Sequence, residues 1–246
     1  MNFFHGTNDR RAFTLVELLI VIAIIGILIA LLFPVLQGAK ARSLQTECLN
    51  NLNQINMGIH LYAGDNSDTL PAAADVSGAV ITTNHWAIFY KRLVKHYLGL
   101  SGASSPVDKV FACPVDAFYY DFPSLAMESQ GYHDQPATDY SSYGFSGANG
   151  SPFNPYSPGV YGWKETAIKD PGHTLLVNEI SALFPWSWHQ PQTLPPGKYG
   201  VNNAKNMVGF MDGHISYLKI YWNTNLDATQ TTYDPPAGYD YKKSAN

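Results

Sequence analysis

The sequence predicts an α+β protein in which one long N-terminal helix leads into a loop-rich head with a small antiparallel sheet. Residues 18–36 form an apolar run without Asp, Glu, Lys or Arg, and an amphipathic stripe continues beyond it. Near the other end of the chain, strand-like runs flank Asp212 and Gly213. Much of the Pro, Gly, Ser and Tyr lies in residues 114–200, which predicts loops with short strands there.

The apolar run is long enough to cross a membrane, because a helix rises about 1.5 Å per residue and the hydrocarbon core is about 30 Å thick. Arg10 and Arg11 precede the run, which places its N-terminal side in the cytoplasm and the head outside. A secretory signal peptide would have a shorter apolar core that ends at a small-x-small cleavage site. A plain membrane anchor would explain the apolar run but not Glu17, because a carboxylate is costly in lipid.

The string R-A-F-T-L-V-E-L-L-I-V-I-A-I-I-G-I-L, over residues 11–28, resembles the class III signal of type IV pilins and type II secretion pseudopilins. The resemblance implies that a prepilin peptidase cuts between Ala12 and Phe13, and that the new Phe13 amine is methylated. Ala12 stands where most family members have glycine. In a filament, the amine of one subunit would meet Glu17 of its neighbour, so that two charges costly in a low-dielectric bundle neutralise each other and set the axial register.

These observations divide the chain into three parts. We expect a cleaved leader over residues 1–12 and a helix over residues 13–62, followed by an extracytoplasmic head over residues 63–246. The helix is expected to be transmembrane over residues 13–36 and to form an amphipathic stalk over residues 37–62.

Pro34 lies inside the helix pattern, where it predicts a kink or local melting because proline removes a backbone hydrogen bond. The sequence leaves open the alternative that Pro34 ends the span. Gly64 is the expected C-cap of the helix. The apolar stripe consists of Ala41, Leu44, Cys48, Leu52, Ile55, Ile59 and Tyr62. The residues expected on the solvated face are Lys40, Arg42, Gln45, Glu47, Asn50, Asn51, Asn53 and Asn56.

A polar turn follows the helix. Asp65, Asn66 and Asp68 offer oxygen ligands within a few residues, which makes them weak calcium candidates. Their spacing differs from that of an EF-hand loop, and a solvated turn with side-chain-to-backbone bonds explains them better. The sequence therefore predicts no cofactor and no other metal, with calcium as the open alternative.

The segment N-M-V-G-F-M-D-G-H-I-S-Y-L-K predicts a hairpin, and its Asp212-Gly213 pair indicates a type I′ turn. With the class III signal, this segment resembles pilin-like proteins that carry a C-terminal H-X9-DG motif, the DUF1559 family. Cys48 on the helix and the stretch around Cys113 support that resemblance. The full motif has a histidine ten residues before its Asp, where this chain has Asn202.

Cys48 and Cys113 are the two cysteines of the chain. A disulfide between them would tie the head to the helix, in a compartment where disulfides persist. The alternative is that Cys48 is simply a small apolar residue of the stripe. Two distant thiols without a Cys-x-x-Cys or His-x-x-x-His pair do not predict zinc.

No enzyme is predicted. The eight histidines are scattered, and the chain has no G-x-S-x-G, H-E-x-x-H or P-loop motif. A net charge of −4 with 14% charged residues does not suit a phosphate-binding surface, so nucleic acid is not an expected partner.

The resemblance implies a structural subunit of a type IV pilus-like filament or a type II secretion pseudopilus, held in the cytoplasmic membrane of a bacterium by a single span. Its implied partners are other copies of itself, other pilin-like subunits, prepilin peptidase, the assembly machinery and the membrane. The alternative is a membrane-anchored glycan-binding protein that uses aromatic platforms at Trp163, Trp186 and Trp188 without assembling. A membrane-tethered hydrolase has less support.

Overall fold

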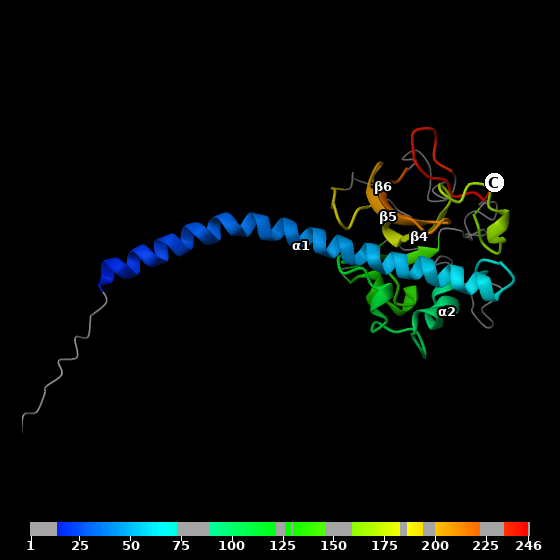
Figure 1. The fold of residues 1–246 in the computed structure, drawn as a ribbon, viewed down its shortest axis with the longest axis horizontal. Coiled ribbons are helices and arrows are strands. Elements are labelled where there is room, and N and C mark those ends of the chain that lie inside the picture. The colour runs from blue at the N-terminus through cyan, green and yellow to red at the C-terminus, as the bar shows by residue number, and fades with distance from the viewer. Residues whose placement is uncertain are drawn as a thin grey trace, which may run out of the picture. The chain divides into compact units, whose positions relative to one another are not determined.

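The computed structural model describes residues 14–72, 89–121, 126–128, 130–145, 159–182, 186–193, 200–221 and 234–245. The chain divides into two compact units, Met1–Ser43 and Leu44–Asn246. The second unit, called the head below, contains the C-terminal part of the long helix together with the sheet (Figure 1). Ala12 and Phe13 lie outside the described residues.

The long helix α1 runs over Leu15–Asp65 and continues unbroken through Pro34. Of the two effects predicted at Pro34, local melting is therefore wrong and the kink stays a prediction. The helix tolerates the loss of one backbone hydrogen bond there. Residues 15–43 of α1 are exposed throughout. Of the described helices, only α1 is long and apolar enough to cross a membrane.

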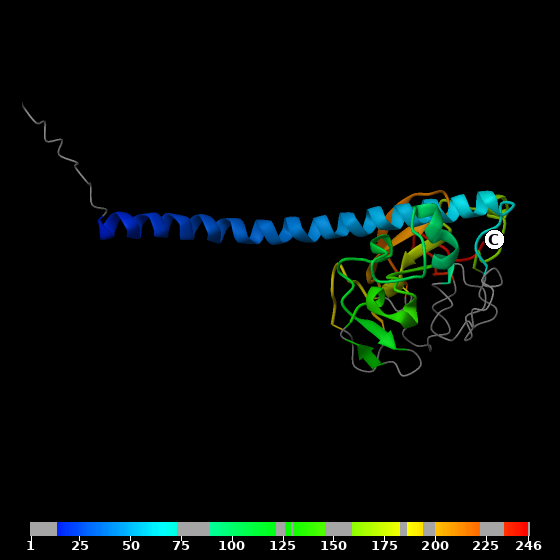
Figure 2. The same cartoon turned by 90° about the horizontal axis from the view of Figure 1, so that it is seen from below.

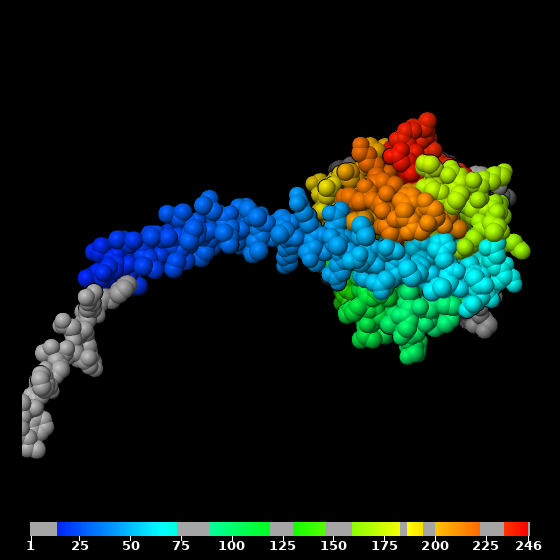
Figure 3. Space-filling view, viewed as in Figure 1, coloured from blue at the N-terminus to red at the C-terminus, as the bar shows by residue number. Residues whose placement is uncertain are grey.

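The C-terminal part of α1 packs on the core of the head along the predicted stripe. Cys48, Leu52, Ile55, Ile59 and Tyr62 are buried, as expected from their spacing. Two other residues of the predicted stripe are not buried: Ala41 is exposed and Leu44 is half-buried. In the space-filling view, the outer side of this part of α1 forms a band between the segment that holds β5 and β6 and the segment that follows α2 (Figure 3).

Two details of this helix differ from the prediction. Asn56, expected on the solvated face, is only 1% exposed. Gly64 is helical and does not cap α1; the backbone turns to the left-handed region only at Ser67 and Asp68, with φ of 56° and 63°. The amide of Asp68 then donates to the carbonyl oxygen of Ala63 at 2.9 Å, which closes the end of the helix.

The main sheet has four strands in the order β3-β4-β5-β6, and all neighbours are antiparallel. The strands are β3 (Tyr143–Phe145), β4 (Leu175–Glu179), β5 (Lys205–Phe210) and β6 (Ile215–Lys219). A separate antiparallel pair is formed by β1 (Tyr119–Asp121) and β2 (Ala126–Glu128). The chain thus has the α+β, pilin-like fold that the sequence predicts.

The sheet separates two apolar clusters. Met207 belongs to the larger cluster, which includes the buried residues of α1. Its neighbours Val208 and Phe210 belong to a smaller cluster with Ile220 and Tyr241. Because side chains alternate along a strand, β5 contributes to both clusters and is buried on both faces.

The β5–β6 hairpin closes at the predicted position but with a different turn. The amide of Phe210 donates to the carbonyl oxygen of His214 at 2.9 Å, and that of Gly213 donates to the carbonyl oxygen of Phe210 at 3.0 Å. Gly213 has φ +94°, whereas Asp212 is not among the described residues with positive φ. A type I′ turn needs positive φ at both central residues, so that prediction is wrong. The loop is the three-residue kind, which needs glycine only at its last position.

Besides the sheet, the head contains several short helices. The helix α2 (Tyr90–Val94) continues directly into η2 (Lys95–Leu98), and the pair lies beside α1 in both views (Figures 1 and 2). Tyr97 packs edge-on against Tyr62 of α1, with ring centroids 6.3 Å apart. The remaining short 3-10 helices are η3 (Lys109–Phe111), η4 (Tyr132–Asp134), η5 (Pro136–Thr138), η6 (Glu165–Ala167) and η7 (Ile180–Ala182).

A buried ionic network fastens α2 and η2 to the loops around them. The amines of Lys91 and Lys95 lie 3.2 and 3.1 Å from the carboxylate of Asp108. Lys91 also donates to the carbonyl oxygens of Asp139 and Tyr140, at 2.8 and 3.0 Å. Burial lowers the pKa of Lys91, and the hydrogen bonds to Asp108 oppose that shift.

Candidate functional site

The first candidate site is the beginning of α1. The side chain of Glu17 accepts hydrogen bonds from the amide of Thr14 at 2.9 Å and from its hydroxyl at 2.8 Å. The amide of Glu17 donates in return to the hydroxyl oxygen of Thr14 at 3.2 Å. This reciprocal arrangement is a capping box, and the spacing T-x-x-E is its sequence signature. Pairing between subunits is the one role predicted for Glu17 from the sequence, and this contact within the chain was not predicted.

The second candidate site is the disulfide between Cys48 in α1 and Cys113 in the loop after η3, whose Cα atoms are 5.2 Å apart. Hydrogen bonds hold both halves in place. The amide side chain of Asn51 donates to the carbonyl oxygen of Ala112 at 3.0 Å, and the amide of Cys113 donates to the hydroxyl oxygen of Ser142 at 3.0 Å. Because both cysteines are fully buried, the bond belongs to the core of the head.

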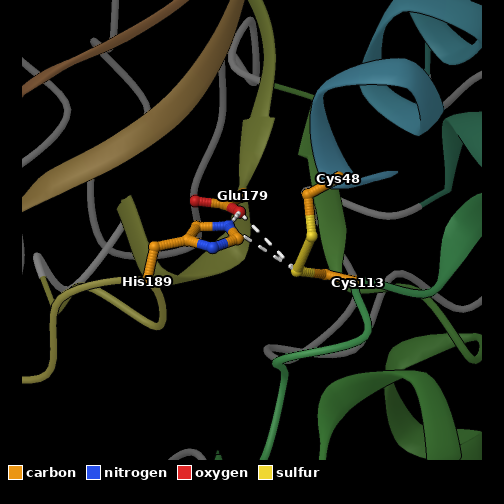
Figure 4. Close-up of side chains that lie close together, drawn as sticks. All are labelled: Cys48, Cys113, Glu179 and His189. Atoms are coloured by element: carbon orange, nitrogen blue, oxygen red, sulfur yellow. Dashed lines mark hydrogen bonds and ion pairs between the residues drawn. A yellow bond between two sulfur atoms is a disulfide. The ribbon is translucent and has the colours of Figure 1, made fainter. Parts of the chain in front are cut away.

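A carboxylate and an imidazole lie against this disulfide (Figure 4). The sulfur of Cys113 is 3.7 Å from Oε1 of Glu179 and 4.0 Å from Nε2 of His189. Nε2 of His189 is 2.9 Å from the same Oε1. Each of these three residues, and Cys48 as well, offers one atom that could bind a metal ion. These four atoms all lie within 4.8 Å of one another. We call these four residues the sulfur cluster.

The elements that carry the sulfur cluster fix its side chains. Glu179 ends β4 and is 0% exposed, and its second oxygen accepts a hydrogen bond from the amide of Met207 in β5 at 2.9 Å. The ring of His189 packs edge-on against Tyr217 of β6, with centroids 5.9 Å apart. No short motif links these residues, because Cys113 and Glu179 are 66 positions apart. Strand pairing and loop packing in the head bring them together.

Comparison with known proteins bears on the first site. The model of the prokaryotic N-terminal methylation motif matches residues 7–33. The chain is 33% identical over 61 residues to the "Type II secretion system core protein G" of Escherichia coli (strain K12), a stretch that is 25% of this chain and 42% of that protein. It is 39% identical over 75 residues to the "Fimbrial protein EcpC" of Eikenella corrodens, which is 30% of this chain and 48% of that protein.

Over these matched stretches the chain is pilin-like. It spans less than half the length of each of these two relatives, and the matches leave most of the head unmatched. No solved structure matches the chain.

The calcium candidates of this pilin-like protein each contact a different partner. A carboxylate oxygen of Asp65 accepts from the hydroxyl of Tyr97 at 3.0 Å, and the side chain of Asn66 donates to the carbonyl oxygen of Tyr62 at 2.7 Å. The carboxylate of Asp68 accepts from the amide of Thr166 at 3.3 Å. Asn66 thus makes the side-chain-to-backbone bond that is typical of a turn, whereas Asp65 and Asp68 accept from groups in other segments.

Asn202, which stands at the position of the motif histidine, is exposed and precedes β5. Its side-chain oxygen accepts a hydrogen bond from the hydroxyl of Tyr239 at 3.2 Å, and Asn203 accepts from the same hydroxyl at 2.8 Å. Because Tyr239 belongs to the C-terminal segment, Asn202 joins that segment to the loop that leads into β5.

At the other end of the hairpin, the imidazole of His214 lies against the carboxylate of Asp212.

The three tryptophans that were proposed as sugar-binding platforms are buried or half-buried in the head. Trp188 is 5% exposed in the larger cluster, and Trp163 packs partly buried against that cluster. The ring of Trp186 lies 4.8 Å from that of Phe118. In this pilin-like protein these rings fill space between loops, which is the alternative to a sugar-binding platform.

Proposed function

We propose that this pilin-like protein is a structural subunit of a type IV pilus-like filament or a type II secretion pseudopilus. The observation that carries the proposal is the continuity of the methylation motif, over residues 7–33, with a helix whose residues 15–43 are exposed. A surface this apolar needs lipid or other helices around it, and a filament core supplies the second after the membrane supplies the first.

In this proposal, prepilin peptidase removes the leader between Ala12 and Phe13 at the cytoplasmic face, and the Phe13 amine is methylated. The head is extracytoplasmic, anchored by one span in the cytoplasmic membrane until assembly. The partners are further copies, other pilin-like subunits and the assembly machinery. One of the two relatives is a secretion core protein and the other is a fimbrial protein, which supports both kinds of filament.

Glu17 has two roles in this proposal. Within a single chain its carboxylate caps α1 through Thr14. In the filament it also compensates the Phe13 amine of the neighbouring subunit, since neither charge is tolerated alone among packed helices. The capping role needs only an acceptor oxygen, whereas the pairing role needs a negative charge.

That difference defines the test. Glu17→Gln keeps an acceptor for the Thr14 amide but removes the charge, Glu17→Ala removes both, and Thr14→Ser preserves the cap. We expect Glu17→Gln and Glu17→Ala to insert in the membrane but to give few filaments, with Thr14→Ser close to wild type. Sheared-filament yield and membrane content measure the two steps. Normal filament yield from Glu17→Gln would show that charge pairing is not what sets the register.

A mass measurement tests the maturation step separately. The mature protein should begin at Phe13 and carry one additional methyl group on its amine. A membrane-bound protein that keeps residues 1–12 and never forms filaments would contradict the proposal and favour a monomeric binding protein.

A further inference from the structure

We propose that the reduced protein binds one zinc ion at the sulfur cluster, with Cys48, Cys113, Glu179 and His189 as ligands. The metal site and the disulfide are then two alternative states of the same four residues. The inference does not depend on filament assembly, because all four ligands belong to the head.

The donor set is the first argument. Zinc prefers thiolate, imidazole and carboxylate ligands in tetrahedral sites, and the sulfur cluster supplies two sulfurs, one nitrogen and one oxygen. Zinc–sulfur bonds of about 2.3 Å and zinc–nitrogen bonds of about 2.0 Å place ligand atoms about 3.3–3.8 Å apart in a tetrahedron.

The geometry is the second argument. The three distances among the Cys113 sulfur, Glu179 Oε1 and His189 Nε2 are 3.7, 4.0 and 2.9 Å, which bracket that spacing. The same imidazole nitrogen lies near both the sulfur and the carboxylate, so the three donor atoms are close neighbours (Figure 4). Once the disulfide is cleaved, the remaining change is a shift of the Cys48 sulfur away from that of Cys113.

Charge is the third argument. The carboxylate of Glu179 is fully buried, and its one ion-pair partner among the described residues is His189. Burying a carboxylate beside a disulfide, which offers no hydrogen-bond donor, is costly. A zinc ion gives the carboxylate a permanent positive partner, and the backbone amide of Met207 orients its second oxygen, as outer-shell groups do in metal sites.

The two states are connected by a two-electron reaction. A dithiol reductant attacks the disulfide, becomes a disulfide itself and leaves two protein thiols. Zinc then displaces the two thiol protons and binds the resulting thiolates. In the reverse direction, a disulfide oxidant takes two electrons from the thiolates, re-forms the Cys48–Cys113 bond and releases zinc.

The test uses the full chain in detergent micelles, reduced with a phosphine and freed of metal. Cobalt(II) replaces zinc as the probe, because a tetrahedral thiolate site gives it intense visible bands and a sulfur-to-metal charge-transfer band. We expect one cobalt ion per chain, displaced by one equivalent of zinc, and no such spectrum from the oxidised protein. His189→Ala and Glu179→Gln should each weaken cobalt binding by at least about 10–100-fold. The loss of an outer-shell partner has an effect of roughly that size, and these two residues are proposed as direct ligands.

The matched control is His173→Ala, which removes a histidine that is 62% exposed and paired with Asp170, outside the cluster. It should bind cobalt as the wild type does, whereas the double variant Cys48→Ser, Cys113→Ser should give no charge-transfer band. Binding that survives His189→Ala unchanged, or a reduced wild type that binds no cobalt, overturns the proposal. If reduction unfolds the head, zinc should restore its circular dichroism, and a head that stays unfolded with zinc also overturns it.

Discussion

Asn56 of α1 donates a hydrogen bond to the backbone carbonyl oxygen of Phe210 in β5, at 3.0 Å and across 154 residues of sequence. Both residues are buried, so this bond fastens the helix to an inner strand of the sheet inside the core. The close approach depends on Gly209, next to Phe210. A Cβ atom at position 209 would lie 2.7 Å from the side-chain nitrogen of Asn56 and 3.0 Å from Ile215.

We therefore predict that Gly209→Ala destabilises the head by about 1–3 kcal/mol, the usual cost of overpacking a core. The matched control is Gly64→Ala, because Gly64 is helical and a Cβ atom there meets nothing within 4 Å. That variant should be neutral or stabilising by roughly 0.5–1 kcal/mol. Urea unfolding followed by circular dichroism measures both, and equal stabilities of the two variants would contradict the close approach.

Replacing both cysteines by serine should lower the stability of the oxidised head. The disulfide closes a loop with a sequence separation of 65 residues, for which the chain-entropy model gives about 4 kcal/mol. Wild type and double variant are compared by urea unfolding without reductant. Unfolding midpoints that coincide would show that the bond is absent from the protein in solution.

Asp108→Asn should be among the most damaging substitutions in the head. It leaves the amines of Lys91 and Lys95 buried without their shared anion, and breaking a buried ion pair costs about 3–5 kcal/mol. Asp240→Asn is the control, because Asp240 is exposed. A loss of stability no larger than that of the control would mean that the lysines find other anions or lose their protons.

The carboxyl group of Asp108 should also make the stability of the head depend on pH in acid. Burial raises the pKa of Asp108, but hydrogen bonds from Lys95, Ser105 and Lys91 outweigh burial and hold the pKa below its ordinary value. A lowered folded-state pKa stabilises the protein above the unfolded value of about 3.9, and this contribution disappears as pH falls through the folded value. The stability difference between wild type and Asp108→Asn should therefore be constant near neutrality and shrink in acid.

His133 should give the opposite dependence. Its imidazole lies 3.1 Å from the carboxylate of Asp116, and this hydrogen bond raises the pKa of His133. A raised folded-state pKa stabilises the protein fully below the unfolded value of about 6.5, and this contribution is lost as pH rises through the folded value. Unfolding free energies of wild type and His133→Gln, measured from about pH 5 to about pH 9, should converge as pH rises. A gap that widens with pH would contradict this assignment.

Local patterns predicted the elements but not their contacts. The stripe through Leu52, Ile55 and Ile59 predicted the buried face of α1, because helical spacing puts these residues on one side. Asn56 lies on the same side, between Leu52 and Ile59, but its polarity assigned it to solvent. Its partner is a carbonyl group 154 residues away, which no local pattern reveals.

The candidate sites show the same division. The hairpin was predicted from Asp212-Gly213. The capping box at Thr14 and Glu17 was not predicted, although its T-x-x-E spacing is a local signature that could have revealed it. The sulfur cluster was not readable, because Glu179 and His189 look like an ordinary strand end and an ordinary loop residue. Their position beside Cys113 follows from strand pairing and loop packing, which depend on the whole head.

The disulfide also has a mechanical consequence. Cys48 is the first buried residue of α1, ahead of Leu52 and every buried residue that follows it. A tensile force that travels along α1 toward the head therefore loads a covalent bond before it loads the buried apolar contacts behind it. Those contacts, including the bond from Asn56 to Phe210, are thereby shielded from a peeling force. Oxidation of two thiols thus makes a covalent junction where the helix enters the head.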